Sequence, residues 1–294
     1  TLFPILYYFG MDVTTPDLLL TAMLLLYAAQ MTVRSYGRRR WDGAATGALG
    51  ALAYLAKAYA LPVVAAHLAI IAAMGLYRAK PIRRRRVVVQ AASALLVLGV
   101  LSSLWGAALK HRYGYFMFGS TGKFNTAFNG PRFKMPMETG VLLPPPTESG
   151  TSGWDDATLL PYTPWNPLAT PADRAAWETN RTRNESAIIA ALQKFTWLLW
   201  PIVLIGVRVA GSTFDPKPRR PGAIFIVLLL IYPLGYYLLH VYERFLSIEC
   251  IGLLVLGVFA VTRLTWPMKV WLRVPLRIAA VLTVAWSFLS NSNY

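Results

Sequence analysis

The sequence predicts an all-α polytopic membrane protein with about eight transmembrane helices and one long loop inserted on the outer face of the membrane. The first observation is composition. Hydrophobic residues make up 56% of the 294 residues, charged residues only 14%, and the mean hydropathy is +0.45, which is too apolar for a water-soluble domain. The second observation is that apolar runs near the ~20 residues that a bilayer requires alternate with short basic segments.

Eight apolar runs, separated by polar or basic segments, are expected to cross the membrane as helices. The second of them, 43–59, is rich in Gly and Ala, which favours close packing against neighbouring helices. The expected spans are 17–33, 43–59, 62–76, 87–109, 187–209, 221–239, 245–261 and 274–289.

A polar insert at 110–186 divides the chain into membrane helices in 1–109, the insert itself, and further membrane helices in 187–294. Proline is dense in the insert, which predicts irregular or short elements as far as Ala169. A helix is expected to begin next, because Thr170 suits a helix cap and the following proline suits the first helical position.

Two stretches of the insert mix aromatic and short polar residues in a way that is typical of sugar-binding surfaces. One contains Trp154, Asp155 and Asp156, and the other, 162–167, contains Trp165. Two interpretations stay open: the tryptophans face a sugar acceptor, or they pack a small core of the loop itself. The two aspartates accordingly bind the acceptor or a divalent cation, or they cap the loop.

The basic residues lie mainly in four of the segments between the apolar runs. These segments hold 18 of the 29 Lys and Arg residues and only two acids, so the positive-inside rule makes them cytoplasmic. The net charge of +16 therefore does not indicate nucleic-acid binding, which would need a soluble module with interleaved aromatic residues. The four segments are 34–42, 77–86, 208–220 and 263–277.

Alternating the spans from this assignment places few ionisable residues at the outer face. A charge near the membrane boundary costs free energy unless it is hydrated, paired or used for binding. Lys57 and Arg244 either reach the lipid headgroups as separate cations, with Arg244 paired to Glu243 or Glu249, or converge as a pocket for a phosphate. The candidate binding residues at this face are Lys57, Tyr59, His240, Tyr242, Glu243 and Arg244.

Three of these stretches resemble the membrane core of the GT-C glycosyltransferases, and most closely the bacterial family 39 type, which is related to protein mannosyltransferases and to the aminoarabinose transferase of lipid A. The Gly-rich helix 47–57 is similar to the family's helix ending in Thr-Lys, with Ala56 where threonine is frequent. The other two stretches are Pro16-Asp17-Leu18-Leu19-Leu20 and Glu243-Arg244-Phe245-Leu246.

The resemblance implies transfer of a sugar from a polyprenyl-phosphate donor to an acceptor glycan, lipid or protein. It also implies a multi-pass protein of the bacterial inner (plasma) membrane, with its basic loops in the cytoplasm. In this family a carboxylate base in the first outer loop activates the acceptor hydroxyl. No matching helix and loop precede Asp12, so we expect the catalytic aspartate in an N-terminal part that lies before this chain.

Two other classes fit the same composition. A secondary transporter or lipid flippase would also have about eight spans, together with discontinuous helices, inverted halves and ionisable groups near the midplane. A non-catalytic membrane assembly subunit would have an anion-binding pocket without a catalytic carboxylate. The presence or absence of an aspartate in an outer loop upstream of this chain discriminates the enzyme from both.

The charge distribution gives a testable topology. Reporter fusions at Arg84, Lys217 and Lys269 should be cytoplasmic, and fusions within 120–180 should be external, because the basic segments resist translocation. Paired cytoplasmic and periplasmic reporters measure both states. An external signal at Lys217 would invert the second half of the chain and separate Lys57 from Arg244.

Overall fold

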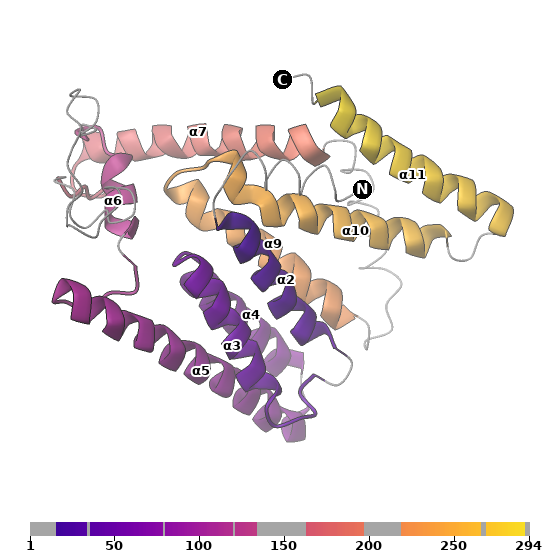
Figure 1. Ribbon diagram of the computed structural model, residues 1–294, viewed down its shortest axis with the longest axis horizontal. Coiled ribbons are helices and arrows are strands. Elements are labelled where there is room, and N and C mark those ends of the chain that lie inside the picture. The colour runs from indigo at the N-terminus through magenta and orange to yellow at the C-terminus, as the bar shows by residue number, and fades with distance from the viewer. Residues whose placement is uncertain are drawn as a thin grey trace. The chain divides into compact units, whose positions relative to one another are not determined.

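The computed structural model describes residues 16–33, 36–78, 80–119, 121–133, 163–196, 219–265 and 269–291. All regular secondary structure in these ranges is helical, which confirms the all-α prediction (Figure 1). The helices are α2 (Asp17–Thr32), α3 (Asp42–Ala56), α4 (Ala60–Arg78), α5 (Pro81–Tyr113), α6 (Thr121–Phe128), α7 (Pro171–Thr196), α9 (Arg219–Leu238), the 3₁₀ helix η5 (Glu243–Leu246), α10 (Ser247–Thr265) and α11 (Val270–Asn291).

Each of the eight apolar runs overlaps one of these helices, so the positions of the helices are confirmed where the chain is described. By length and composition, two described segments could cross a membrane, Ala60–Tyr77 and Arg83–Tyr113. Two shorter helical segments, Asp17–Thr32 and Ile224–Leu238, are also apolar. The eight-span topology stays a prediction.

The described part of the insert has the short elements that its prolines predict. It holds the eight-residue helix α6, turns at 129–133 and 163–170, and then the start of α7. The helix start at Pro171 is confirmed, since the Thr170 hydroxyl accepts a hydrogen bond from the Asp173 amide at 3.1 Å and donates one to its carboxylate at 2.7 Å. Residues 154–156 lie outside the described ranges.

The helices belong to two compact units, which we describe separately. The first comprises Thr1–Ser102, Ile188–Pro233 and Tyr242–Tyr294. The second comprises Ser103–Ala187 and Leu234–Val241.

The core of the first unit is built on one face of α2. Leu20, Leu24, Tyr27 and Met31 recur every three or four residues and are at most 3% exposed, and α2 packs against α3 and α10. A buried hydrogen-bond chain crosses this core. Nδ1 of His67 lies 2.7 Å from the Tyr27 hydroxyl oxygen, and Nε2 lies 2.8 Å from the Ile224 carbonyl oxygen. The ring therefore joins α2, α4 and α9.

Glycines bring α3 and α5 into backbone contact. A Cβ atom at Gly43 would lie 2.3 Å from the carbonyl oxygen of Gln90, and one at Gly47 would lie 2.2 Å from that of Ala94. Small residues at this four-residue spacing let two helices approach closely. The Gly-rich composition of 43–59 therefore predicted this packing correctly.

Substitution at this contact should destabilise the protein. We expect Gly47→Ala to lower the free energy of unfolding by about 1–3 kcal/mol, because the added methyl group meets helix backbone that cannot move aside. Gly99 in α5 is a matched control, because a Cβ atom there meets nothing within 4 Å. Gly99→Ala should be neutral or stabilising by up to about 1 kcal/mol. Equal thermal stability of the two variants in detergent would contradict the contact.

Candidate functional site

Lys57 lies where α3 ends, and it is held by an acid from the start of α2. Its backbone is extended and its amide donates to the Ala53 carbonyl, which closes the helix at 3.0 Å. Its Nζ atom lies 2.5 Å from Oδ1 of Asp17, whose side chain is only 4% exposed. The two helices run antiparallel, so the beginning of one meets the end of the other.

Arg244 reaches the same place from η5. Both cations approach the Phe245 ring, with Nζ of Lys57 at 3.9 Å and Cζ of Arg244 at 5.3 Å from its centroid. The Tyr242 ring packs edge-on against Phe245 and lies 5.2 Å from the guanidinium carbon. We call this group the Lys57–Arg244 site; its members are Asp17, Lys57, Tyr242, Arg244 and Phe245.

The electrostatics of the Lys57–Arg244 site favour an added negative charge. The Lys57 ammonium is paired with one acid, Asp17, while the Arg244 guanidinium brings a second positive charge to the same ring. The Nε atom of Arg244 is buried without a hydrogen-bond acceptor among the described residues. An anion between the two cations would supply that acceptor and offset their repulsion.

The beginning of α10 packs against α2 near the Lys57–Arg244 site, but its acid does not neutralise the two cations. The hydroxyls of Thr21 and Ser247 lie 2.7 Å apart and join α2 to α10. Glu249, two residues further on, is 5% exposed, and neither of its carboxylate oxygens has a hydrogen-bond partner among the described residues. The interpretation that pairs Arg244 with Glu249 is therefore wrong.

Tyr59 has a structural contact instead of a free hydroxyl. It donates a hydrogen bond to the carbonyl oxygen of Tyr232 in α9, and the two rings meet edge to face at 5.4 Å. This contact fixes the start of α4 against α9. Glu243 opens η5 and is half-buried next to Arg244 in the chain.

His240 belongs to the second unit and Lys57 to the first, so the expectation that they share one site stays a prediction. Its ring packs edge-on against Phe128 at 5.7 Å. Burial lowers the pKa of His240, and the charge of Arg183 lowers it further. The imidazole is therefore neutral at pH 7 and suits a packing role in this unit.

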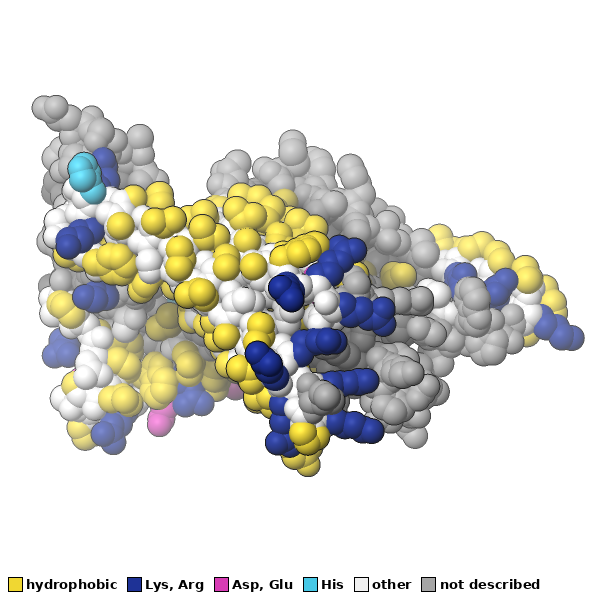
Figure 2. Space-filling view, turned by 90° about the horizontal axis from the view of Figure 1, so that it is seen from below, with side chains coloured by type: hydrophobic (Ala, Val, Ile, Leu, Met, Phe, Trp, Pro, Cys, Tyr) yellow, Lys and Arg dark blue, Asp and Glu magenta, His cyan; other side chains and the backbone are white. Residues whose placement is uncertain are grey.

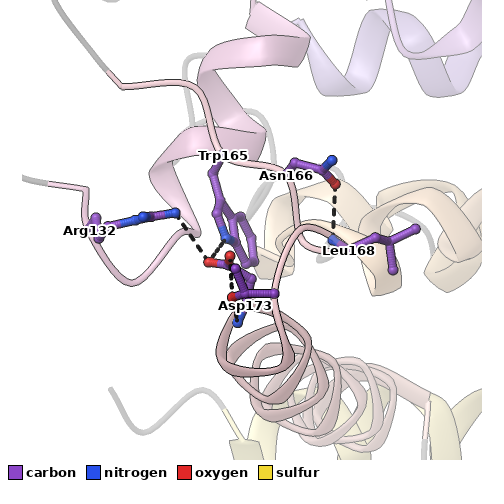
Figure 3. Close-up of polar contacts among 6 residues, drawn as sticks. Arg132, Trp165, Asn166, Leu168 and Asp173 are labelled. Carbon is purple, nitrogen blue, oxygen red and sulfur yellow. Dashed lines mark hydrogen bonds and ion pairs between the residues drawn. The ribbon is translucent and has the colours of Figure 1, made fainter.

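A polar cluster of the insert surrounds Asp173 (Figure 3). Its Oδ1 atom accepts hydrogen bonds from the Trp165 indole at 2.9 Å and from the Arg132 guanidinium at 3.3 Å. The hydrogen bonds from Thr170 and Trp165, together with the Arg132 charge, lower the pKa of Asp173. A Cβ atom at Gly130 would lie 2.8 Å from Trp165, so this tryptophan packs inside the insert, as the second interpretation of 162–167 predicts.

A second cluster attaches α7 to the end of α9. The Arg181 guanidinium lies 5.1 Å from the rings of both Trp177 and Tyr237 and donates to the Tyr237 hydroxyl at 2.8 Å. The Asn184 amide, on a side chain that is almost fully buried, donates to the carbonyl oxygens of Tyr237 and Leu239. These contacts satisfy carbonyl groups that the end of a helix leaves unpaired.

No group of three or more His, Cys, Asp or Glu residues that could hold a metal ion occurs in the described part of the chain. Asp155 and Asp156, which the sequence suggests for a cation, are not within that part. Comparisons of the chain with protein-family models, with curated proteins and with solved structures find no match.

Sequence reasoning missed Asp17 as a member of the site. It was assigned to the start of a span, where an acid favours the helix dipole. The available signal was its position, because the same alternation of spans that places Lys57 at the outer face also places Asp17 there.

Removing the Asp17 carboxylate should reveal the free-energy cost of burying the Lys57 ammonium. We expect Asp17→Asn to lower the free energy of unfolding at pH 7 by about 1–3 kcal/mol, because the ammonium loses its partner.

Thermal unfolding in detergent at pH 7 measures this effect. The double variant Asp17→Asn/Lys57→Met is the control, since it has no amine at this position and should be more stable than the single variant. Equal losses of stability in the single and double variants would show that another contact causes them.

Proposed function

We propose that the chain is the membrane core of a glycosyltransferase that moves a sugar from a polyprenyl-phosphate donor to an acceptor at the outer face of the membrane. The observation that best supports the proposal is the meeting of Lys57 and Arg244 on the Phe245 ring. The two residues lie far apart in the sequence, one just after α3 and the other just before α10, and the two helix ends meet. A lipid-linked phosphate at the membrane boundary needs cations of this kind beside it.

The membrane part of the proposal has its own support. The segment Arg83–Tyr113 of α5 is long enough and, between its charged ends, apolar enough to cross a membrane, and many of its large side chains are exposed. An exposed apolar face of this length suits contact with lipid. We propose eight crossings, with the basic segments in the cytoplasm. The exposed side chains include Val88, Val89, Leu95, Leu96, Val100 and Leu104.

The chemistry of transfer fits the residues of the Lys57–Arg244 site. When the bond between the anomeric carbon and the phosphate oxygen breaks, negative charge grows on the departing polyprenyl phosphate. Lys57 and Arg244 stabilise that charge, and the Nε–H of Arg244, which has no acceptor among the described residues, donates a hydrogen bond to it. Asp17 holds Lys57 in its charged form and in position, while Phe245 and Tyr242 fix the two cations from the side.

A transporter or flippase for the same class of lipid is the second candidate. The observation that favours it is the presence of ionisable groups inside apolar helices. His67 is fully buried and bonded to Tyr27, and Glu249 is buried without a partner among the described residues. Such groups occur in the proton pathways of transporters. This candidate moves the lipid-linked sugar intact, whereas the enzyme separates the sugar from the phosphate.

The deciding experiment uses the protein in liposomes with a panel of radiolabelled polyprenyl-phosphate sugars. Transfer of label from the lipid to an acceptor, with release of polyprenyl phosphate, is expected for the enzyme. Movement of intact donor across the bilayer without release would support the flippase instead.

Two substitutions test the site. Lys57→Ala and Arg244→Ala should each reduce transfer roughly ten- to thousandfold without unfolding the protein, because each removes a charge-assisted contact to phosphate. Lys57→Arg should restore part of the rate, since the charge returns with a different geometry. Lys123→Ala, an exposed lysine of α6, is the matched control and should retain normal transfer. Near-normal rates in both folded alanine variants would refute the phosphate site.

A further inference from the structure

A dense group of cations lies away from the Lys57–Arg244 site, at the turn between α2 and α3 and at the start of α5. Figure 2 shows Lys and Arg side chains crowded at one end of a band of hydrophobic side chains. All of them are exposed, and none forms an ion pair within the described residues. We call this group the basic surface; its members are Arg38, Arg39, Arg40, Lys80, Arg83, Arg84, Arg85 and Arg86.

The two parts of the basic surface are joined by specific contacts. The side-chain amide of Gln90 in α5 donates a hydrogen bond to the Arg39 carbonyl at 2.9 Å. One turn away, the close approach of Gly43 to Gln90 brings the start of α3 against the same helix. The arginines of the turn and those of α5 therefore face solvent from one continuous piece of the first unit.

The local acid does not neutralise these cations. Asp42 is 2% exposed, and its Oδ2 atom accepts hydrogen bonds from the amides of Gly37 at 2.7 Å and Arg39 at 3.1 Å. Gly37 has a φ of +78°, a conformation that other residues rarely adopt. The carboxylate therefore shapes the turn from inside, and the guanidinium groups of Arg38 to Arg40 remain outside.

The cations at the start of α5 are electrostatically unfavourable on their own. Arg83 to Arg86 occupy the first two turns of the helix, where the backbone dipole is positive, and they also repel one another. A bound anion would reverse both effects. Such an arrangement stabilises the helix only when negative charge lies next to it.

The surroundings of the basic surface identify the kind of anion. Trp41 is 54% exposed with the Arg39 guanidinium 5.3 Å from its ring, and Tyr77 is 90% exposed. Exposed Val88 and Val89 follow the arginines directly along α5. Tryptophan and tyrosine favour the level of lipid headgroups, and the apolar side chains favour the acyl chains below. A soluble phosphate compound or a nucleic acid would make no use of this apolar border.

We propose that the basic surface binds the headgroups of anionic phospholipids, with α5 entering the acyl region beneath them. Clusters of four to eight Lys and Arg residues next to a membrane helix bind anionic lipids at about 1 kcal/mol per cation, or roughly fivefold in affinity. The inference rests on the membrane part of the proposed function and is independent of sugar transfer.

The test uses the full chain in detergent with equal amounts of phosphatidylglycerol and phosphatidylcholine, and counts retained lipids by native mass spectrometry. We expect the wild type to prefer phosphatidylglycerol, and the preference to fall with salt. The quadruple variant Arg83→Gln/Arg84→Gln/Arg85→Gln/Arg86→Gln should reduce the preference at least tenfold. Arg38→Gln/Arg39→Gln/Arg40→Gln provides a second variant if the first does not fold.

The matched control is Lys110→Gln/Arg112→Gln/Lys123→Gln, which removes exposed cations from the end of α5 and from α6 and should keep the preference. Equal retention of the two lipids by the wild type, or an equal loss in the control, would overturn the inference. Complete competition by inorganic pyrophosphate or a short oligonucleotide at equal phosphate concentration would also overturn it. The lipid-retention test contains no sugar donor and is therefore independent of the transfer assay. A chain that keeps its lipid preference but transfers no sugar would count against the proposed enzyme alone.

Discussion

The ion pair between Asp17 and Lys57 is the contact on which the arrangement of the first unit depends. An ammonium at the end of an apolar helix needs a counter-charge, and the nearest one comes from the beginning of the preceding helix. The pair therefore fixes how far α2 and α3 can slide along one another. It also fixes the position of Lys57 along the axis of α3. That position brings the cation to Phe245 and Arg244.

Packing elsewhere in the unit makes this pairing possible. The glycines of α3 allow α5 to approach on one side, while the buried face of α2 holds α10 on the other. The Thr21–Ser247 hydrogen bond then fixes the start of α10 against α2, and η5 immediately precedes that start in the chain. These contacts between helices hold the Lys57 and Arg244 cations together before a ligand arrives.

Much of the fold follows from sequence, because long apolar runs leave a helix as the main way to satisfy the backbone. The start of α7 also followed, from local cap chemistry. For Lys57 and Arg244 the sequence left two arrangements open, separate cations or a shared pocket, and the contacts of both cations with Phe245 favour the second. The partners of Asp17, Tyr59 and Trp165 did not follow, because each depends on which helix faces which. Composition gave both tryptophan interpretations equal standing, and the contacts of Trp165 with Gly130 and Asp173 favour packing within the insert.

The length of α5 has a geometric consequence. At about 1.5 Å per residue, its 33 residues extend for roughly 50 Å, whereas the hydrocarbon core of a bilayer is about 30 Å thick. A helix of this length that crosses a membrane must project into water or tilt steeply. Its charged residues are confined to the two ends, Arg83–Arg86 and Lys110–Arg112, so the excess length belongs to those ends. If α5 crosses a membrane, as we propose, it is long enough to serve as a spacer between the lipid headgroups and the first residues of the insert.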